Sequence, residues 1–127
     1  MPHEKVGATL KRKLAPGRIV MTEVGANHAV LDHAKTDLPK VVAAIRAGFH
    51  RVEFVGREEI GGAGANTALY LPVPSSKEEW AVIPVSTHVD AYGDYRARSG
   101  FIAGQAEVDR RLEARGGQPP RIIRVPK

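Results

Sequence analysis

The sequence predicts an α+β fold, a single antiparallel sheet of about four to five strands with one main amphipathic helix packed on it and a second, C-terminal helix. Three observations support this class: helical spacing of apolar residues in one segment, two-residue alternation in later segments, and turn residues between them. The 127 residues suit a single domain. We divide it into a basic N-terminal segment 1–17, a core 18–116, and a basic tail or strand 117–127.

Two short elements precede the main helix. Residues 4–14 predict a short basic helix that stops before the turn pair Pro16-Gly17. Residues 18–24 are rich in strand-forming side chains, so they predict a strand.

The main helix is predicted over residues 37–47. Asp37 or Thr36 can cap its first turn, which accepts Pro39 because early helical N–H groups need no partner within the helix. Gly48 follows at the position where a left-handed residue often ends a helix. Apolar residues at offsets 0, 3, 4, 7 and 11 form one face; they are Leu38, Val41, Val42, Ile45 and Phe49.

Two segments after this helix alternate with a period of two, which is typical of half-buried strands. Residues 50–55 would place Val52 and Phe54 on the same face of the sheet. Residues 67–73 would place Leu69, Leu71 and Val73 on one face.

A longer strand is predicted over residues 79–89. Because Pro84 cannot donate a hydrogen bond to a neighbouring strand, it implies a sheet edge or a β-bulge. The turn residues 74–77 connect this strand to the preceding one, so the two should form a hairpin.

The C-terminal third predicts a loop, a helix and a last strand. Residues 91–100 are expected to form a loop. Residues 103–115 predict a second helix, supported by Glu107 four residues before Arg111. Residues 121–125 are expected to return as a final strand.

Charge is distributed unevenly along the chain. The formal net charge is +5, with +4 in residues 1–20, +5 in residues 96–127 and −4 in the segment between them. Domain termini often lie close together, and the two ends would then form one positive face that attracts polyanions such as nucleic acid. The alternative is that the basic excess only keeps the protein in solution.

The composition excludes several classes of site. The chain has no cysteine, and therefore no disulfide, thiolate nucleophile or cysteine zinc site. The five histidines lack helical ligand spacing, and His88 with Asp90 would supply only two ligands, so we expect no metal and no cofactor. Apolar runs fall far short of the roughly 20 residues of a membrane span, and the charged first residues do not predict a signal peptide. We therefore expect a cytoplasmic protein with no membrane partner.

Polar residues around the main helix predict a site for phosphate chemistry. Cleavage of RNA without a metal needs a general base, a general acid, and cations or hydroxyl donors around the phosphorane. The predicted catalytic residues are His33 and His88 as acid and base, Arg51 and Lys35 to hold phosphate, and Thr87 as a hydrogen-bond donor. The alternative is that each of these residues has an ordinary structural role.

Two tyrosines and two arginines in the predicted loop form a second candidate; they are Tyr92, Tyr95, Arg96 and Arg98. Aromatic rings beside guanidinium groups suit stacking on unpaired bases, so these residues are candidate RNA contacts. The same residue types also anchor a loop to its own protein surface.

Three short motifs lie between residues 33 and 101: His33-Ala-Lys35, Asp37-Leu-Pro-Lys40 and Val85-Ser-Thr-His88. Through them about half of the chain resembles the barnase–EndoU–colicin–RelE-like nuclease superfamily, in particular its phage and polymorphic-toxin members. The positions that match its catalytic residue types are His33, Lys35, Arg51, Thr87 and His88; His88-Val-Asp90 stands where an aromatic residue is more usual. The resemblance implies a metal-independent ribonuclease, often a toxin with an immunity or antitoxin partner.

A second function fits the same sequence. A non-enzymatic phage or mobile-element protein could use the basic face to bind nucleic acid or to inhibit a protein partner. Cleavage of RNA in the presence of a chelator distinguishes the enzyme from this binding protein.

Overall fold

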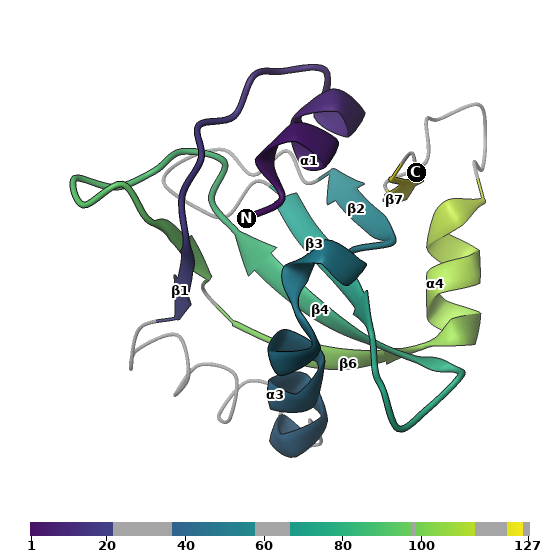
Figure 1. Ribbon diagram of the computed structural model, residues 1–127. Coiled ribbons are helices and arrows are strands. Elements are labelled where there is room, and N and C mark those ends of the chain that lie inside the picture. Colours follow the sequence, from purple (N-terminus) through teal and green to yellow (C-terminus); the bar gives the residue numbers. More distant parts are fainter. Residues whose placement is uncertain (22–36, 58–66, 98, 114–121, 126–127) are drawn as a thin grey trace.

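The computed structural model describes residues 1–21, 37–57, 67–97, 99–113 and 122–125 (Figure 1). Its helices are α1 (His3–Leu10), α3 (Leu38–Ala47), α4 (Gln105–Leu112) and the 3₁₀ turn η1 (Phe49–Arg51). Its strands are β1 (Ile19–Met21), β2 (Phe54–Arg57), β3 (Thr67–Pro72), β4 (Glu79–Val85), β5 (Tyr95–Ala97), β6 (Phe101–Gly104) and β7 (Ile122–Arg124).

The sheet is mixed and has seven strands, in the order β1-β5-β4-β3-β2-β7, with β6 also paired to β4. β1 runs parallel to β5, and the other pairs are antiparallel. The α+β class is confirmed, whereas the predicted sheet of four to five antiparallel strands is wrong in both number and direction. The missed strands β5 and β6 have three and four residues, too few to show a period.

Pro84 lies in an interior strand of the sheet, at the point where the neighbour of that strand changes from β6 to β5. β4 is flanked by β3 on one side and by β5 and β6 on the other. Val82 pairs with Phe101 and Val85 pairs with Ala97, so three steps along β4 oppose four steps along its neighbour. The pairing on this side of β4 therefore passes from β6 to β5 beside Pro84, where a residue without an N–H loses no hydrogen bond to a continuous neighbouring strand.

Both faces of the sheet are covered. One buried cluster contains Val6 of α1 and Val41 of α3 together with Leu69, Leu71, Val73 and other sheet residues. The opposite cluster contains Val108 of α4 together with Phe54, Tyr70, Trp80 and Val82. α1 and α3 therefore pack on one face and α4 packs on the other (Figure 1).

The region after α3 differs from the predicted strand 50–55. Residues 49–51 form η1, and β2 begins only at Phe54. Val52 packs with the α1–α3 cluster, whereas Phe54 packs with the α4 cluster, so the prediction of a shared face was wrong. The turn breaks the alternation because it changes the backbone direction just before the strand.

The predicted main helix is confirmed as α3. The Asp37 carboxylate accepts a hydrogen bond from the Lys40 backbone N–H at 3.3 Å, as an N-cap does, and Pro39 lies in the first turn. The Lys40 ammonium also pairs with the Glu79 carboxylate at 2.7 Å, which fixes the start of α3 against the start of β4. This contact raises the pKa of Lys40 and lowers that of Glu79.

The remaining elements follow the predictions in outline. The β3–β4 hairpin is confirmed, and its turn is closed by the bond from Ser76 N–H to Val73 C=O at 3.1 Å. α4 begins at Gln105 and contains the Glu107–Arg111 ion pair at 2.7 Å. β7 confirms the last strand, and it pairs with β2. The N-terminal helix α1 also contacts β2, so α1 and β7 both lie next to β2 (Figure 1).

A basic groove as the candidate functional site

The structure describes only part of the predicted catalytic set. His33, Lys35 and the loop residue Arg98 lie outside the described residues. Arg51 is the last residue of η1, three residues before β2 begins. Thr87 and His88 follow the end of β4.

Thr87 is a buried residue with a partner that the sequence did not suggest. Its side chain is 5% exposed, and its hydroxyl oxygen accepts a hydrogen bond from Arg12 Nη1 at 3.2 Å. His88 next to it is exposed. Arg12 also lines a hollow of about 600 Å³ beside α1, together with Lys11 and Lys13. The predicted hydroxyl therefore lies beside the basic segment that follows α1.

Arg51 and Thr87 lie near opposite ends of β4. Arg51 lines a hollow with Trp80, which is the second residue of β4, whereas Thr87 follows its last residue. Seven residues of extended chain between Trp80 and Thr87 span about 20 Å. The structure therefore does not bring these two predicted residues into one cleft.

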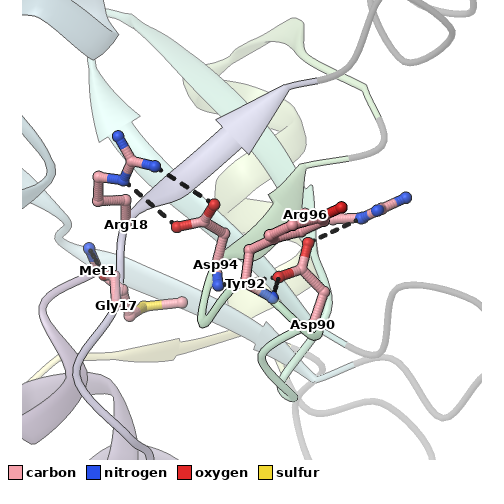
Figure 2. A network of polar contacts seen from close by, with 7 residues as sticks. All are labelled: Met1, Gly17, Arg18, Asp90, Tyr92, Asp94 and Arg96. Carbon is pink, nitrogen blue, oxygen red and sulfur yellow. Dashed lines mark hydrogen bonds and ion pairs between the residues drawn. The ribbon is translucent and has the colours of Figure 1, made fainter.

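The predicted stacking loop is held by its own ion pairs (Figure 2). Asp90 accepts hydrogen bonds from the backbone N–H groups of Tyr92 at 2.9 Å and Asp94 at 3.1 Å, and from Arg96 Nε at 3.1 Å. The backbone bond from Asp94 is the main reason that the pKa of Asp90 is lowered. Tyr92 is 85% exposed at the tip of this turn. This geometry matches the anchoring interpretation of the loop, and it leaves Tyr92 free to contact another molecule.

Tyr95 does not have the exposure that base stacking requires. It is 1% exposed, and its hydroxyl donates a hydrogen bond to the Ala15 carbonyl. Burial raises the pKa of its hydroxyl. A side chain at Gly17 would come within 2.5 Å of the Gly93 carbonyl and 3.1 Å of the Tyr95 ring, so the chain can pass here only as glycine. Tyr95 thus connects the N-terminal segment to β5 as a core residue.

A second group of charged residues lies where α1 and β7 flank β2. A hollow of about 300 Å³ is lined by residues of α1, η1, the approach to β2, and β7. Its charged and titratable lining residues are Lys5, His50, Arg51, Glu53 and Arg124. Lys5 comes from the basic N-terminal segment and Arg124 from the basic C-terminal one, so one cation from each end lies here. Lys11, Arg12 and Lys13 of the same N-terminal segment line the other hollow, beside α1.

The charges in this hollow are only partly compensated. Arg124 Nη2 pairs with Glu53 Oε1 at 2.5 Å. Within the described part of the chain, Lys5 and Arg51 have no hydrogen bond from their side chains and no ion pair, and both are exposed. As far as the described residues go, two cations without an ion pair therefore stand beside one neutralised pair, which is an arrangement that attracts an anion.

Backbone geometry places His50 in the same hollow. Gly48 has φ of +107°, a conformation that side chains disfavour. A Cβ at Gly48 would lie 2.6 Å from His50 Nδ1, so the imidazole rests directly over this glycine. The C-terminus of α3 thereby fixes where His50 enters the hollow.

A second hollow of about 500 Å³ adjoins the first and shares Arg51, Glu53 and Arg124 with it. Its floor includes Phe54 and Trp80, whose rings meet edge to face with centroids 5.0 Å apart. We call the two hollows together the basic groove. Its cationic residues are Lys5, Arg51, Lys77 and Arg124, and His50 lies among them.

The larger hollow is rigid at its floor and charged at its rim. Trp80 Nε1 donates to Gln105 Oε1 at 2.9 Å, and the Arg124 guanidinium lies 5.4 Å from the Phe54 ring centroid. Lys77, from the β3–β4 turn, is exposed on the rim. Phe54 and Trp80 are mostly covered, at 4% and 8% exposure, so the larger hollow combines a charged rim with a small apolar area. A ligand that carries both a ring and a negative charge suits such a combination.

Motif reasoning missed most of the groove. Only Arg51 was among the predicted site residues. The charge excess at the two ends indicated Lys5 and Arg124 as a group, because a shared positive face needs such residues. His50 and Lys77 have no sequence pattern that separates them from surface residues.

Comparisons with protein-family models, curated proteins and solved structures found no match to this chain. Among the residues that the structure describes, no three His, Asp or Glu side chains are grouped to hold a metal ion. No helix in the described ranges has the length and apolarity needed to cross a membrane.

Proposed function

We propose that this protein binds nucleic acid, with RNA as the preferred candidate, in the basic groove. The observation that carries the proposal is the meeting of Lys5, Arg51 and Arg124 in one hollow, although they come from three distant parts of the sequence. Cations that converge on one hollow can each contact a phosphate, and the release of counterions from nucleic acid then drives binding.

Binding is tested by fluorescence anisotropy with a labelled single-stranded RNA at several salt concentrations. The double variant Lys5→Gln/Arg51→Gln removes two groove cations that make no ion pair with a described residue. If each contacts one phosphate, the slope of log K against log[salt] should fall by about 1.4 for a single strand.

The matched control is Arg46→Gln/Arg110→Gln. These two arginines are exposed on α3 and α4, and neither lines the groove. The control removes the same net charge, so it should change the slope much less. Equal losses in the two double variants, or no binding by the wild type, would contradict the proposal.

Cleavage of the bound RNA is a second candidate, favoured by the presence of His50 and Glu53 in the same hollow. The Glu53 carboxylate would take the proton of a 2′-hydroxyl while the 2′-oxygen forms a bond to phosphorus. The bond from phosphorus to the 5′-oxygen would break, and protonated His50 would give its proton to that oxygen. Lys5 and Arg51 would stabilise the charge on the phosphorane.

The groove candidate uses His50 as the general acid, whereas the prediction from sequence uses His33 and His88 as acid and base. Labelled RNA is incubated with the protein in EDTA, and the variants His50→Gln, His88→Gln and His33→Gln are compared. Loss of cutting in His50→Gln alone supports the groove site, whereas loss in His88→Gln or His33→Gln supports the residues predicted from sequence. Binding without cutting identifies a non-enzymatic RNA-binding protein. A toxin role with an immunity or antitoxin partner stays a prediction of the resemblance.

A further inference from the structure

We propose that the basic groove selects unpaired nucleotides, with a phosphate in the smaller hollow and the adjoining base in the larger one. This inference rests on the proposed function and specifies its ligand as single-stranded nucleic acid. The two hollows share a wall and differ in part of their lining: Lys5 and His50 line only the smaller one, whereas two prolines and Trp80 line only the larger one. A nucleotide likewise joins a charged phosphate to an uncharged ring.

The smaller hollow suits a phosphate. At about 300 Å³ it is lined by Lys5, His50 and Arg51. Lys5 and Arg51 come from α1 and η1 and make no ion pair within the described residues. Their charges are therefore available to a ligand, and Arg can approach two phosphate oxygens at once.

The larger hollow suits a base rather than a second phosphate. Its acidic side chains, Glu53 and Glu79, are each paired with a cation of the protein, Arg124 and Lys40. Pro72 and Pro74 give it apolar surface, Trp80 reaches it with the small part of its ring that is exposed (8% for the residue), and Lys77 stands at its rim. Both hollows lie within the range of about 300–1,000 Å³ that is usual for small-molecule sites.

The shared wall fixes the spacing between the two parts of the ligand. Arg51 and Arg124 line both hollows, so a phosphate held by Arg51 places its sugar at the boundary. A base in a duplex is stacked and paired, and it cannot enter the larger hollow without leaving the stack, which has an energetic cost. An unpaired base enters without that cost.

Trp80 makes the proposal directly measurable because it is the only tryptophan in the chain and lines the larger hollow. Its emission is recorded during titration with oligouridylate, the matching duplex with oligoadenylate, and a wholly abasic ribose–phosphate chain of the same length. We expect oligouridylate to change the Trp80 emission until it saturates, with the same midpoint concentration that the anisotropy titration gives for binding. We expect the duplex and the abasic chain to bind about five-fold or more weakly and to leave the emission unchanged.

Two serines of the β3–β4 turn supply a matched pair of variants. Ser76 lines the larger hollow, whereas the neighbouring exposed Ser75 does not. Ser76→Leu should abolish the preference for oligouridylate over the abasic chain and leave the affinity for the abasic chain intact. Ser75→Leu should preserve both. Thermal unfolding checks that both variants are folded.

The outcomes separate this inference from the proposed function. Equal affinity for the three ligands with unchanged Trp80 emission would overturn the inference while leaving nucleic-acid binding in place. A change of emission that survives in Ser76→Leu would also overturn it, because the base would then lie elsewhere. No binding of any ligand would overturn the proposed function itself.

Discussion

Replacing Gly48 by alanine should destabilise the fold and displace His50 from the basic groove. Two separate effects contribute. The backbone angles of Gly48, φ +107° and ψ 148°, fall in a region that is essentially restricted to glycine, and holding another residue there costs about 1–3 kcal/mol. In addition, the new Cβ would lie 2.6 Å from His50 Nδ1, which forces the imidazole to turn away.

The second effect is smaller because His50 is exposed and can change rotamer. A side chain pushed about 30° from its rotamer costs roughly 0.5–1.5 kcal/mol. The sum for Gly48→Ala is therefore about 2–4 kcal/mol. For a domain of this size it should lower Tm by roughly 3–6 °C per kcal/mol.

A double-mutant cycle in urea separates the two effects. In a His50→Ala background the imidazole is absent, so Gly48→Ala should cost only the backbone part, about 1–3 kcal/mol. The same loss with and without His50 would refute the contact between them. A Gly48→Ala variant as stable as the wild type would refute the assigned backbone conformation as well.

Three further predictions test the rest of the structure. Asp90→Asn should lower the free energy of unfolding at neutral pH, and the difference from wild type should shrink in acid. Because the pKa of folded Asp90 is lowered, the carboxylate contributes its full stabilisation above the ordinary aspartate pKa, and this contribution is lost as the pH falls through and below that range. Urea titrations at several pH values measure the effect. Leu69→Ala, at a fully buried position, should cost about 2–5 kcal/mol in the same assay, and a loss below that range would indicate a loosely packed core. Arg111→Leu should cost about 1–2 kcal/mol, because Arg111 Nη1 donates to the hydroxyl of buried Tyr70 at 2.9 Å; no change in unfolding free energy would refute that contact.

Local sequence patterns were sufficient to predict the elements that are stabilised by residues close to one another in the sequence. α3 has its cap at Asp37, its proline in the first turn, and a glycine after its last residue, and each of these signals acts within a few residues. The β3–β4 hairpin was predictable for the same reason, since a turn joins two alternating segments. Pro84 predicted either a sheet edge or a bulge; β4 is an interior strand, and Pro84 lies beside the place where its neighbour changes from β6 to β5.

Non-local pairing decided what the sequence patterns missed. β1 has three residues and pairs in parallel with β5, which lies more than seventy residues later. No turn residue or apolar period in the sequence predicts such a pair, because two strands so far apart pair only when the rest of the fold brings them together. Tyr95 illustrates the result: beside Arg96 it resembles a stacking residue, yet the β1–β5 pairing buries it against the N-terminal segment.

The candidate site is a consequence of this same long-range topology. If β7 had paired at the β1 edge, Arg124 would lie across the sheet from Lys5, and the charge excess of the two ends would be divided between two edges. Instead β7 pairs with β2, and α1 contacts β2, so each end places one cation, Lys5 or Arg124, in one hollow with Arg51. The field of convergent charges is strongest where their distances to a ligand are all short. The affinity for a polyanion should therefore depend on the register of β7 against β2, as well as on the number of basic residues in the sequence.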